Sequence, residues 1–102
     1  MNPNKNPRTK FLPGQIVATP GAIEAMRASG QNAHDFLGRH LRGDWGDLDD
    51  EDRRMNDEAL IDGSRLLSAY TTTKGVKLWI ITEAVGDDGR RTSTCVLLPE
   101  EY

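Results

Sequence analysis

The chain has 102 residues and a formal net charge of -3 at pH 7, with 36% hydrophobic and 28% charged residues. A chain of this length forms one domain with a small core and leaves no room for a second. The net charge argues against a whole-surface affinity for nucleic acid or anionic membranes, and no stretch approaches the ~18 apolar residues of a membrane span. We therefore expect a single domain that makes no membrane contact.

The first ten residues have the composition of a disordered arm. "MNPNKNPRTK" contains three Asn, two Pro and the basic residues Lys5, Arg8 and Lys10, with no acid. A segment so poor in apolar side chains cannot offset the entropy of ordering, and three charges on it contact phosphates only weakly. We place the ordered domain at residues 11–102 and expect any nucleic-acid contact to be confined to this arm.

The next segments predict a strand and two helices. Residues 14–19, "GQIVAT", are short and β-branched, which favours an edge strand. Thr19 and Pro20 are typical of a helix start, and we predict a helix from there to about Ser29. Asn32 can cap a second helix. The apolar face of that helix has the spacing i, i+3, i+4, i+7, i+8 and consists of Ala33, Phe36, Leu37, His40 and Leu41.

Residues 42–60, "RGDWGDLDDEDRRMNDEAL", have the most unusual composition, with eight acidic residues and one tryptophan. "GDWGD" has turn chemistry. From Asp49, a cap, to Gly63, a terminator, the pattern predicts a third helix whose first turn is acidic, as the helix dipole favours. A calcium loop starting at Asp47 would have Asp52 where a Gly is needed. Arginines interrupt the acidic surface that a nucleic-acid mimic would present, so we favour a solvated helix start without a bound metal.

Beyond Gly63 the periodicity changes from helical to strand-like, and residues 64–73, 75–84 and 91–99 predict three strands. Short loops join them, which requires antiparallel pairing. We therefore predict an α+β fold in which two or three N-terminal helices cover one face of a three- to four-stranded antiparallel meander sheet. The predicted core consists of Ile16, Ile23, Met26, Phe36, Leu37, Leu41, Leu60, Leu67, Leu78, Ile80, Val96 and Leu98.

No catalytic residues are predicted. His34 and His40 are six positions apart and therefore on different helix faces, unlike a chelating i, i+4 pair, and His40 falls on the apolar stripe. Cys95, the single cysteine, lies within a strand, where a thiol is usually inert. It cannot form an internal disulfide, which indicates a reducing, cytoplasmic setting. No phosphate loop or other cofactor motif is present, so we expect no cofactor.

Five residues are candidates for binding: Asp44, Trp45, Asp47, Tyr70 and Trp79. An indole in a Gly-Asp turn either packs back on the core or waits for a partner. Tyr70 and Trp79 are expected, with Ile81, on the sheet face away from the helices, which becomes a homodimer interface or ligand surface if nothing covers it. We interpret the chain as a non-enzymatic accessory protein that binds a protein partner through its acidic, Trp-bearing loop and helix.

Two alternatives remain at the level of sequence. One is a metal-dependent hydrolase or nuclease, because Lys77 and Glu83 share a strand face with Trp79 and acids at 44–52 could join them. The other is an acidic nucleic-acid mimic.

The strings "GDWGDLDDEDRRMNDEALIDGSRLLSAY", "LWIITEA" and "VLLPEEY" resemble a group of short orphan proteins of bacterial plasmids and integrated mobile elements, over about residues 11–102. Some of these are labelled restriction-modification subunit M. Methylation would require a glycine-rich cofactor loop and an Asn-Pro-Pro-aromatic motif, and neither occurs here. The group has no established catalytic residues. The resemblance implies a small accessory or regulatory protein of a mobile element.

Overall fold

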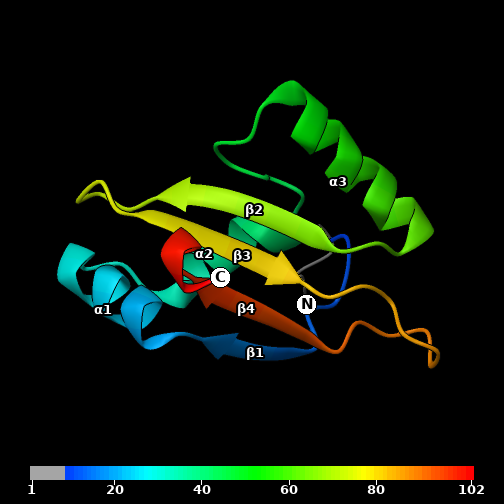
Figure 1. The fold of residues 1–102 in the computed structure, drawn as a ribbon, viewed down its shortest axis with the longest axis horizontal. Coiled ribbons are helices and arrows are strands. Elements are labelled where there is room, and N and C mark those ends of the chain that lie inside the picture. Colours follow the sequence, from blue (N-terminus) through cyan, green and yellow to red (C-terminus); the bar gives the residue numbers. More distant parts are fainter. Residues whose placement is uncertain (1–8) are drawn as a thin grey trace, which may run out of the picture.

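A computed structural model of the protein describes residues 9–102 and shows an α+β fold (Figure 1). Its elements follow the order β1 (Gln15–Ala18), α1 (Pro20–Ser29), α2 (Ala33–Leu41), α3 (Asp50–Asp62), β2 (Leu66–Thr71), β3 (Lys77–Thr82), β4 (Ser93–Leu97) and the 3-10 helix η2 (Pro99–Glu101). The α+β class and the three helices are thus confirmed. Within the described residues, no helix has the length and apolarity to cross a membrane.

The four strands form one sheet in the order β1-β4-β3-β2. The pairs β2-β3 and β3-β4 are antiparallel, which confirms the predicted meander. The prediction of a purely antiparallel sheet is wrong, because β1 pairs parallel with β4. Three helices separate β1 from the other strands, so no short turn fixes its direction, and such a long crossover permits parallel pairing.

The helix ends follow local capping chemistry. The Thr19 side chain accepts a hydrogen bond from the Ala22 amide, and the Asp49 side chain accepts one from the Asp52 amide. Asn32 forms a reciprocal capping box with Asp35. Each cap satisfies an amide that the helix itself leaves unpaired, and this explains why the helix starts were readable from the sequence.

The helices α1 and α2 lie against one face of the sheet, whereas α3 lies beside β2 at the rim (Figure 1). The prediction that all the helices cover one face of the sheet is therefore wrong for α3. Strand pairing places Ser68, Ile80 and Val96 on the helix-covered face. The main core lies there and consists of Ala22, Met26, Phe36, Leu37, Tyr70, Leu78, Ile80 and Val96.

The predicted orientation of β2 is wrong. Leu66, Ser68 and Tyr70 point toward the helices, and Leu67 lies on the second face, opposite Ile81. Ser68 is buried despite its hydroxyl because it forms a hydrogen bond with His40. The predicted alternation, with Leu67 in the core and Tyr70 on the face away from the helices, is thus reversed.

Two isoleucines predicted to be core residues are exposed, Ile16 and Ile23. Ile16 belongs to β1, at the rim of the sheet. Ile23 follows Ala22 in α1, which buries Ala22 and Met26. Because successive helix positions turn by about 100°, Ile23 faces away from the sheet.

Most of the predicted N-terminal arm, including Lys5 and Arg8, lies outside the described residues. The described part of the arm begins at Thr9. There the Lys10 amide donates a hydrogen bond to the carbonyl of Leu41, at 2.7 Å, and so joins the chain to the end of α2.

Candidate functional site

The acidic, Trp-bearing loop lies along the outer edge of β2. The Ala69 amide donates to the carbonyl of Trp45 at 3.1 Å, and the Asp47 amide donates to the carbonyl of Ala69 at 2.7 Å. Two residues away along β2, the Asn56 side chain donates to the Leu67 carbonyl at 2.7 Å and accepts from the Leu67 amide at 3.1 Å. These bonds occupy the backbone groups with which an edge strand could pair with another chain. The rim of the sheet at β2 is therefore closed.

Trp45 is part of the protein interior, with 4% of its surface exposed. Its indole N–H donates to Asp57 Oδ1 at 3.1 Å. Around it packs a second hydrophobic cluster made of Ala59, Leu66, Phe11, Leu48 and Leu60. In this position the indole joins α3 to β2 and offers no surface to a partner.

The structure brings Asp44, Asp47 and Tyr70 together around the same loop. Arg39 donates two hydrogen bonds to the carboxylate of Asp44, at 2.8 and 3.3 Å, and lowers the pKa of that carboxyl group. The Tyr70 hydroxyl donates to the carbonyl of Asp44 at 2.6 Å. Burial raises the pKa of Tyr70 to about 12. The Asp47 carboxylate accepts from the Thr71 hydroxyl at 2.8 Å, so all three predicted binding residues hold the loop on β2.

Trp79, the fifth predicted binding residue, lies elsewhere. It is half-buried on the second sheet face, opposite Ala69 and Leu97. The ring of Tyr102 packs edge-on against it, with centroids 5.9 Å apart. Arg65 lies over the Tyr102 ring and donates to its hydroxyl. Of the five candidates, Trp79 is thus the one on the second sheet face, whereas the exposed carboxylates of Asp44 and Asp47 lie at the loop.

A buried chain of polar groups links α2 to the sheet. The Thr94 hydroxyl donates to the Pro13 carbonyl at 2.8 Å, so in its 2.7 Å contact with Thr82 it must accept. The Thr82 hydroxyl therefore donates its hydrogen to Thr94. Because that hydrogen is already engaged, Thr82 accepts from His40 Nε2 at 2.8 Å. His40 Nδ1 is left to accept from the hydroxyl of Ser68. For a neutral imidazole, the hydrogen-bond directions therefore place the ring proton on Nε2.

His40 and Ser68 resemble a base beside a nucleophile, but neither has any exposed surface. A substrate must reach the nucleophile for such a pair to act. Burial, with the nearby positive charge of Arg91, lowers the pKa of His40 to about 3. The residue is thus a neutral structural link at physiological pH.

Acidification is expected to destabilise the protein through His40. Because its pKa falls from 6.5 in the unfolded chain to about 3 in the folded protein, the unfolded chain binds more protons between these values. The contribution of His40 to stability is fully present above its pKa in the unfolded chain. It is lost as the pH falls toward its pKa in the folded protein. Urea unfolding should show a loss of about 2 kcal/mol from about pH 7.5 to about pH 5.

The change His40→Gln removes this titration and should flatten the pH dependence over the same range. Nuclear magnetic resonance of the His40 ring in the wild-type protein gives a second readout that does not require the variant to fold. A ring that becomes protonated above about pH 5 would contradict the assignment.

The predicted hydrolase cluster does not assemble. Lys77 is the first residue of β3 and Glu83 follows its last, and six strand positions separate two residues by about 20 Å. Across residues 9–102, no group of three or more His, Cys, Asp or Glu side chains is placed to hold a metal ion.

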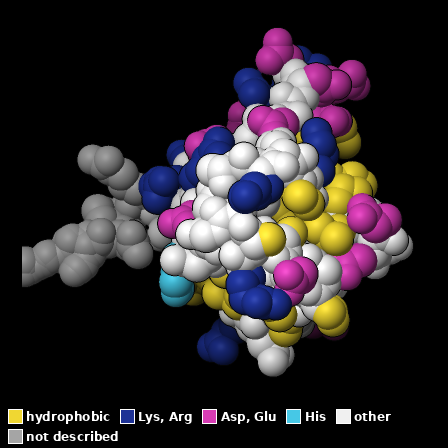
Figure 2. Space-filling view, turned by 90° about the vertical axis from the view of Figure 1, so that its left-hand side faces the viewer, with side chains coloured by type: hydrophobic (Ala, Val, Ile, Leu, Met, Phe, Trp, Pro, Cys, Tyr) yellow, Lys and Arg dark blue, Asp and Glu magenta, His cyan; other side chains and the backbone are white. Residues whose placement is uncertain are grey.

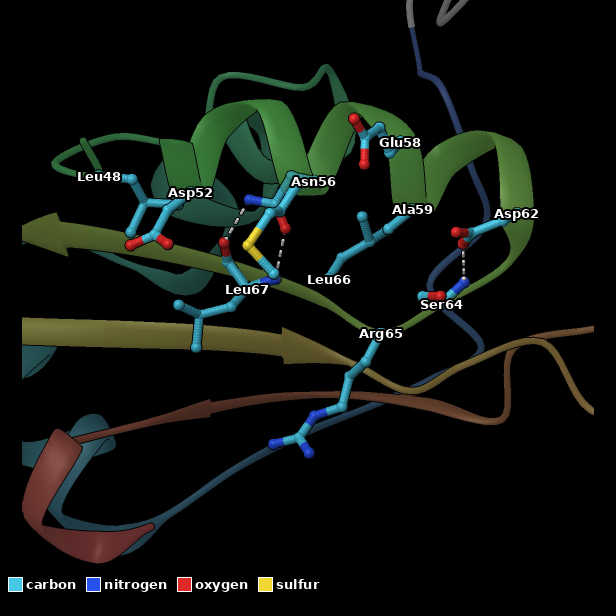
Figure 3. Close-up of a pocket in the computed structure, with 11 residues that line it drawn as sticks. Leu48, Asp52, Asn56, Glu58, Ala59, Asp62, Ser64, Arg65, Leu66 and Leu67 are labelled. Carbon is cyan, nitrogen blue, oxygen red and sulfur yellow. Dashed lines mark hydrogen bonds between the residues drawn. The ribbon is translucent and has the colours of Figure 1, made fainter. Parts of the chain in front are cut away.

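A groove of about 380 Å³ lies between α3 and β2 (Figure 3). Its lining residues are Leu48, Asp52, Met55, Asn56, Glu58, Ala59, Asp62, Ser64, Arg65, Leu66 and Leu67. Five of them are apolar, three are acids of α3, and Arg65, the residue before β2, is the single cation among them. Met55 is 59% exposed. The groove is therefore apolar in its floor and acidic along its α3 wall.

The groove opens toward the second sheet face. Leu67 lies on that face by the alternation of β2. Arg65, the residue before β2, lies over the Tyr102 ring, and Figure 3 shows its side chain directed away from α3. Figure 2 shows hydrophobic side chains gathered below α3 and bordered by acidic ones. Met55, Leu67 and Arg65 were not among the predicted binding residues. A methionine within an otherwise acidic helix was the signal that could have found the first of them.

No protein-family model, curated protein or solved structure matches this chain.

Proposed function

We propose that the protein is a small, non-enzymatic accessory module that binds a protein partner through the groove between α3 and β2. The bound segment of the partner is basic and apolar. The observation that carries this proposal is the pairing of an apolar floor with an acidic wall on α3. The binding surface thus includes the acidic helix but not the indole of Trp45, which is buried.

Each part of the groove supplies a different contribution to binding. Burial of apolar surface on Met55 and Leu67 supplies affinity, at about 25 cal/mol per Å². The carboxylates Asp52, Glu58 and Asp62 favour lysine or arginine in the partner and speed its approach. Methionine, arginine and aromatic residues are enriched at interfaces, and Arg65, which lines the groove, also contacts Tyr102 of the Trp79 and Tyr102 pair beside it.

The cytoplasmic setting and the mobile-element origin expected from the sequence are parts of this proposal. A chain of 102 residues whose groove accepts a short segment suits an accessory or regulatory role.

A random peptide display library selected against the purified protein tests the proposal. We expect enriched peptides to carry lysine or arginine interleaved with apolar residues. The change Met55→Lys should weaken binding of a selected peptide at least about tenfold, because it places a charge among the apolar side chains that line the groove.

The matched control is Ile61→Lys. It adds the same charge to an exposed apolar position of α3, 89% exposed, that does not line the groove. Peptide binding should remain within about twofold of wild type. Enrichment of acidic peptides, or equal loss in both variants, would overturn the proposed site.

A further inference from the structure

The two rims of the sheet differ in how they are covered. At β2 the outward backbone groups are occupied by Trp45, Asp47 and Asn56. At the other rim, β1 pairs with β4 and with no other strand of residues 9–102. Figure 1 shows α3 beside β2 and no corresponding element beside β1. An uncovered edge strand is a ready template for pairing with another chain.

The outward backbone groups of β1 belong to Ile16 and Ala18. The amides of the odd-numbered residues point to β4. The Gln15 amide donates to the Thr92 carbonyl and the Thr19 amide donates to the Val96 carbonyl, each at 3.0 Å. Successive residues of a strand point their amide and carbonyl groups to opposite sides. Ile16 and Ala18 therefore present two donors and two acceptors to the outside.

Although β1 has only four residues, it lacks the charged and proline residues that usually prevent edge pairing. Gln15–Ala18 contains no charged residue and no proline, whereas proteins commonly protect an edge with lysine, proline or a bulge. Ile16 is 48% exposed and Val17 42% exposed, and they lie on opposite faces of the sheet. The rim is thus apolar on both faces as well as unpaired.

We propose that β1 pairs antiparallel with β1 of a second copy of this chain, across a two-fold axis at Val17, and joins two four-stranded sheets into one of eight strands. In this register Ile16 lies opposite Ala18 of the second copy, and Ala18 opposite its Ile16. Each such pair exchanges two hydrogen bonds, so all four outward groups on each copy are used. Val17 meets its own counterpart at a position without hydrogen bonds, where side chains approach most closely.

A second copy fits this edge because the pairing is self-complementary. Every side chain brought opposite another by Ile16, Val17 and Ala18 is apolar, which favours cross-strand contact. A net charge of -3 on each copy opposes association only weakly. The edge lies at the rim opposite the groove of the proposed function, so either surface can fail without the other.

Sedimentation velocity of the full chain over a range of concentrations tests the pairing. The wild-type mass should rise from 11.3 kDa toward twice that value. The change Val17→Lys places two lysines opposite each other across the axis and should raise the dissociation constant at least about tenfold. The control Val85→Lys changes a valine that is 41% exposed outside β1 and should dimerise as wild type does.

Cysteine substitution checks the register. In a Cys95→Ser background, needed because Cys95 pairs with Val17 in the sheet, Val17→Cys should form a disulfide between copies upon oxidation. Gln15→Cys should not, because its two copies are far apart. A wild-type protein that stays monomeric up to about 1 mM overturns the proposal. Dimerisation of Val17→Lys equal to that of wild type would also overturn it. The same holds if β1 binds an extended foreign peptide but not a second copy.

Discussion

The change Trp45→Ala is expected to lower the free energy of unfolding by about 3–5 kcal/mol, the range for removing a large buried aromatic side chain. The indole is 4% exposed and packs against Ala59 and Leu66. Its removal also leaves Asp57 without the donor that it has in the wild-type protein. Urea unfolding followed by circular dichroism measures the loss.

Trp79→Ala provides the comparison for Trp45. Trp79 is half-buried on the second sheet face, so its truncation should cost about 1–2 kcal/mol. If Trp45→Ala does not fold, Trp45→Phe keeps a ring and should give an intermediate loss. Equal losses at the two tryptophans would indicate that Trp45 is not packed in the interior and remains available to a partner.

The change Gly46→Ala should cost more than about 3 kcal/mol. Gly46 has a φ of 79°, and a Cβ there would lie 2.0 Å from the carbonyl oxygen of Ala69. The left-handed backbone alone costs about 1–2 kcal/mol with a side chain. The clash would in addition separate the loop from β2 and break its two hydrogen bonds with Ala69.

Gly75→Ala separates these two causes. Gly75 has a φ of 85°, and nothing lies within 4 Å of its would-be Cβ, so only the backbone cost of about 1–2 kcal/mol should appear. Thermal or urea unfolding of both variants gives the comparison. A Gly46→Ala variant no less stable than Gly75→Ala would contradict the close approach of the loop to β2.

Those parts of the fold that depend on neighbouring residues were predictable. Thr19, Asn32 and Asp49 start helices through contacts three residues away, and the short loops after Gly63 fixed the antiparallel meander. The direction of β1 was not predictable because its partner, β4, lies beyond three helices in the chain.

The candidate site was less predictable because its residues depend on distant partners. Ser68 faces inward, where it bonds to His40, 28 residues away, and no local pattern in the sequence indicates this contact. For Trp45, the sequence left core packing and partner binding open, and its contacts with Asp57 and Leu66 exist only in the folded chain. The groove likewise combines residues of α3 and β2 that no single motif contains.

Taken together, these contacts mean that the acidic loop closes one rim of the sheet and leaves the other rim open. Amide hydrogen exchange measured by nuclear magnetic resonance, at a dilution where the protein is monomeric, tests this difference most directly. The Leu67 and Ala69 amides, bonded to Asn56 and Trp45, should exchange slowly, and those of Ile16 and Ala18 should exchange rapidly. Equally rapid exchange at all four amides would show that the loop does not cover β2 and that Trp45 is free to bind.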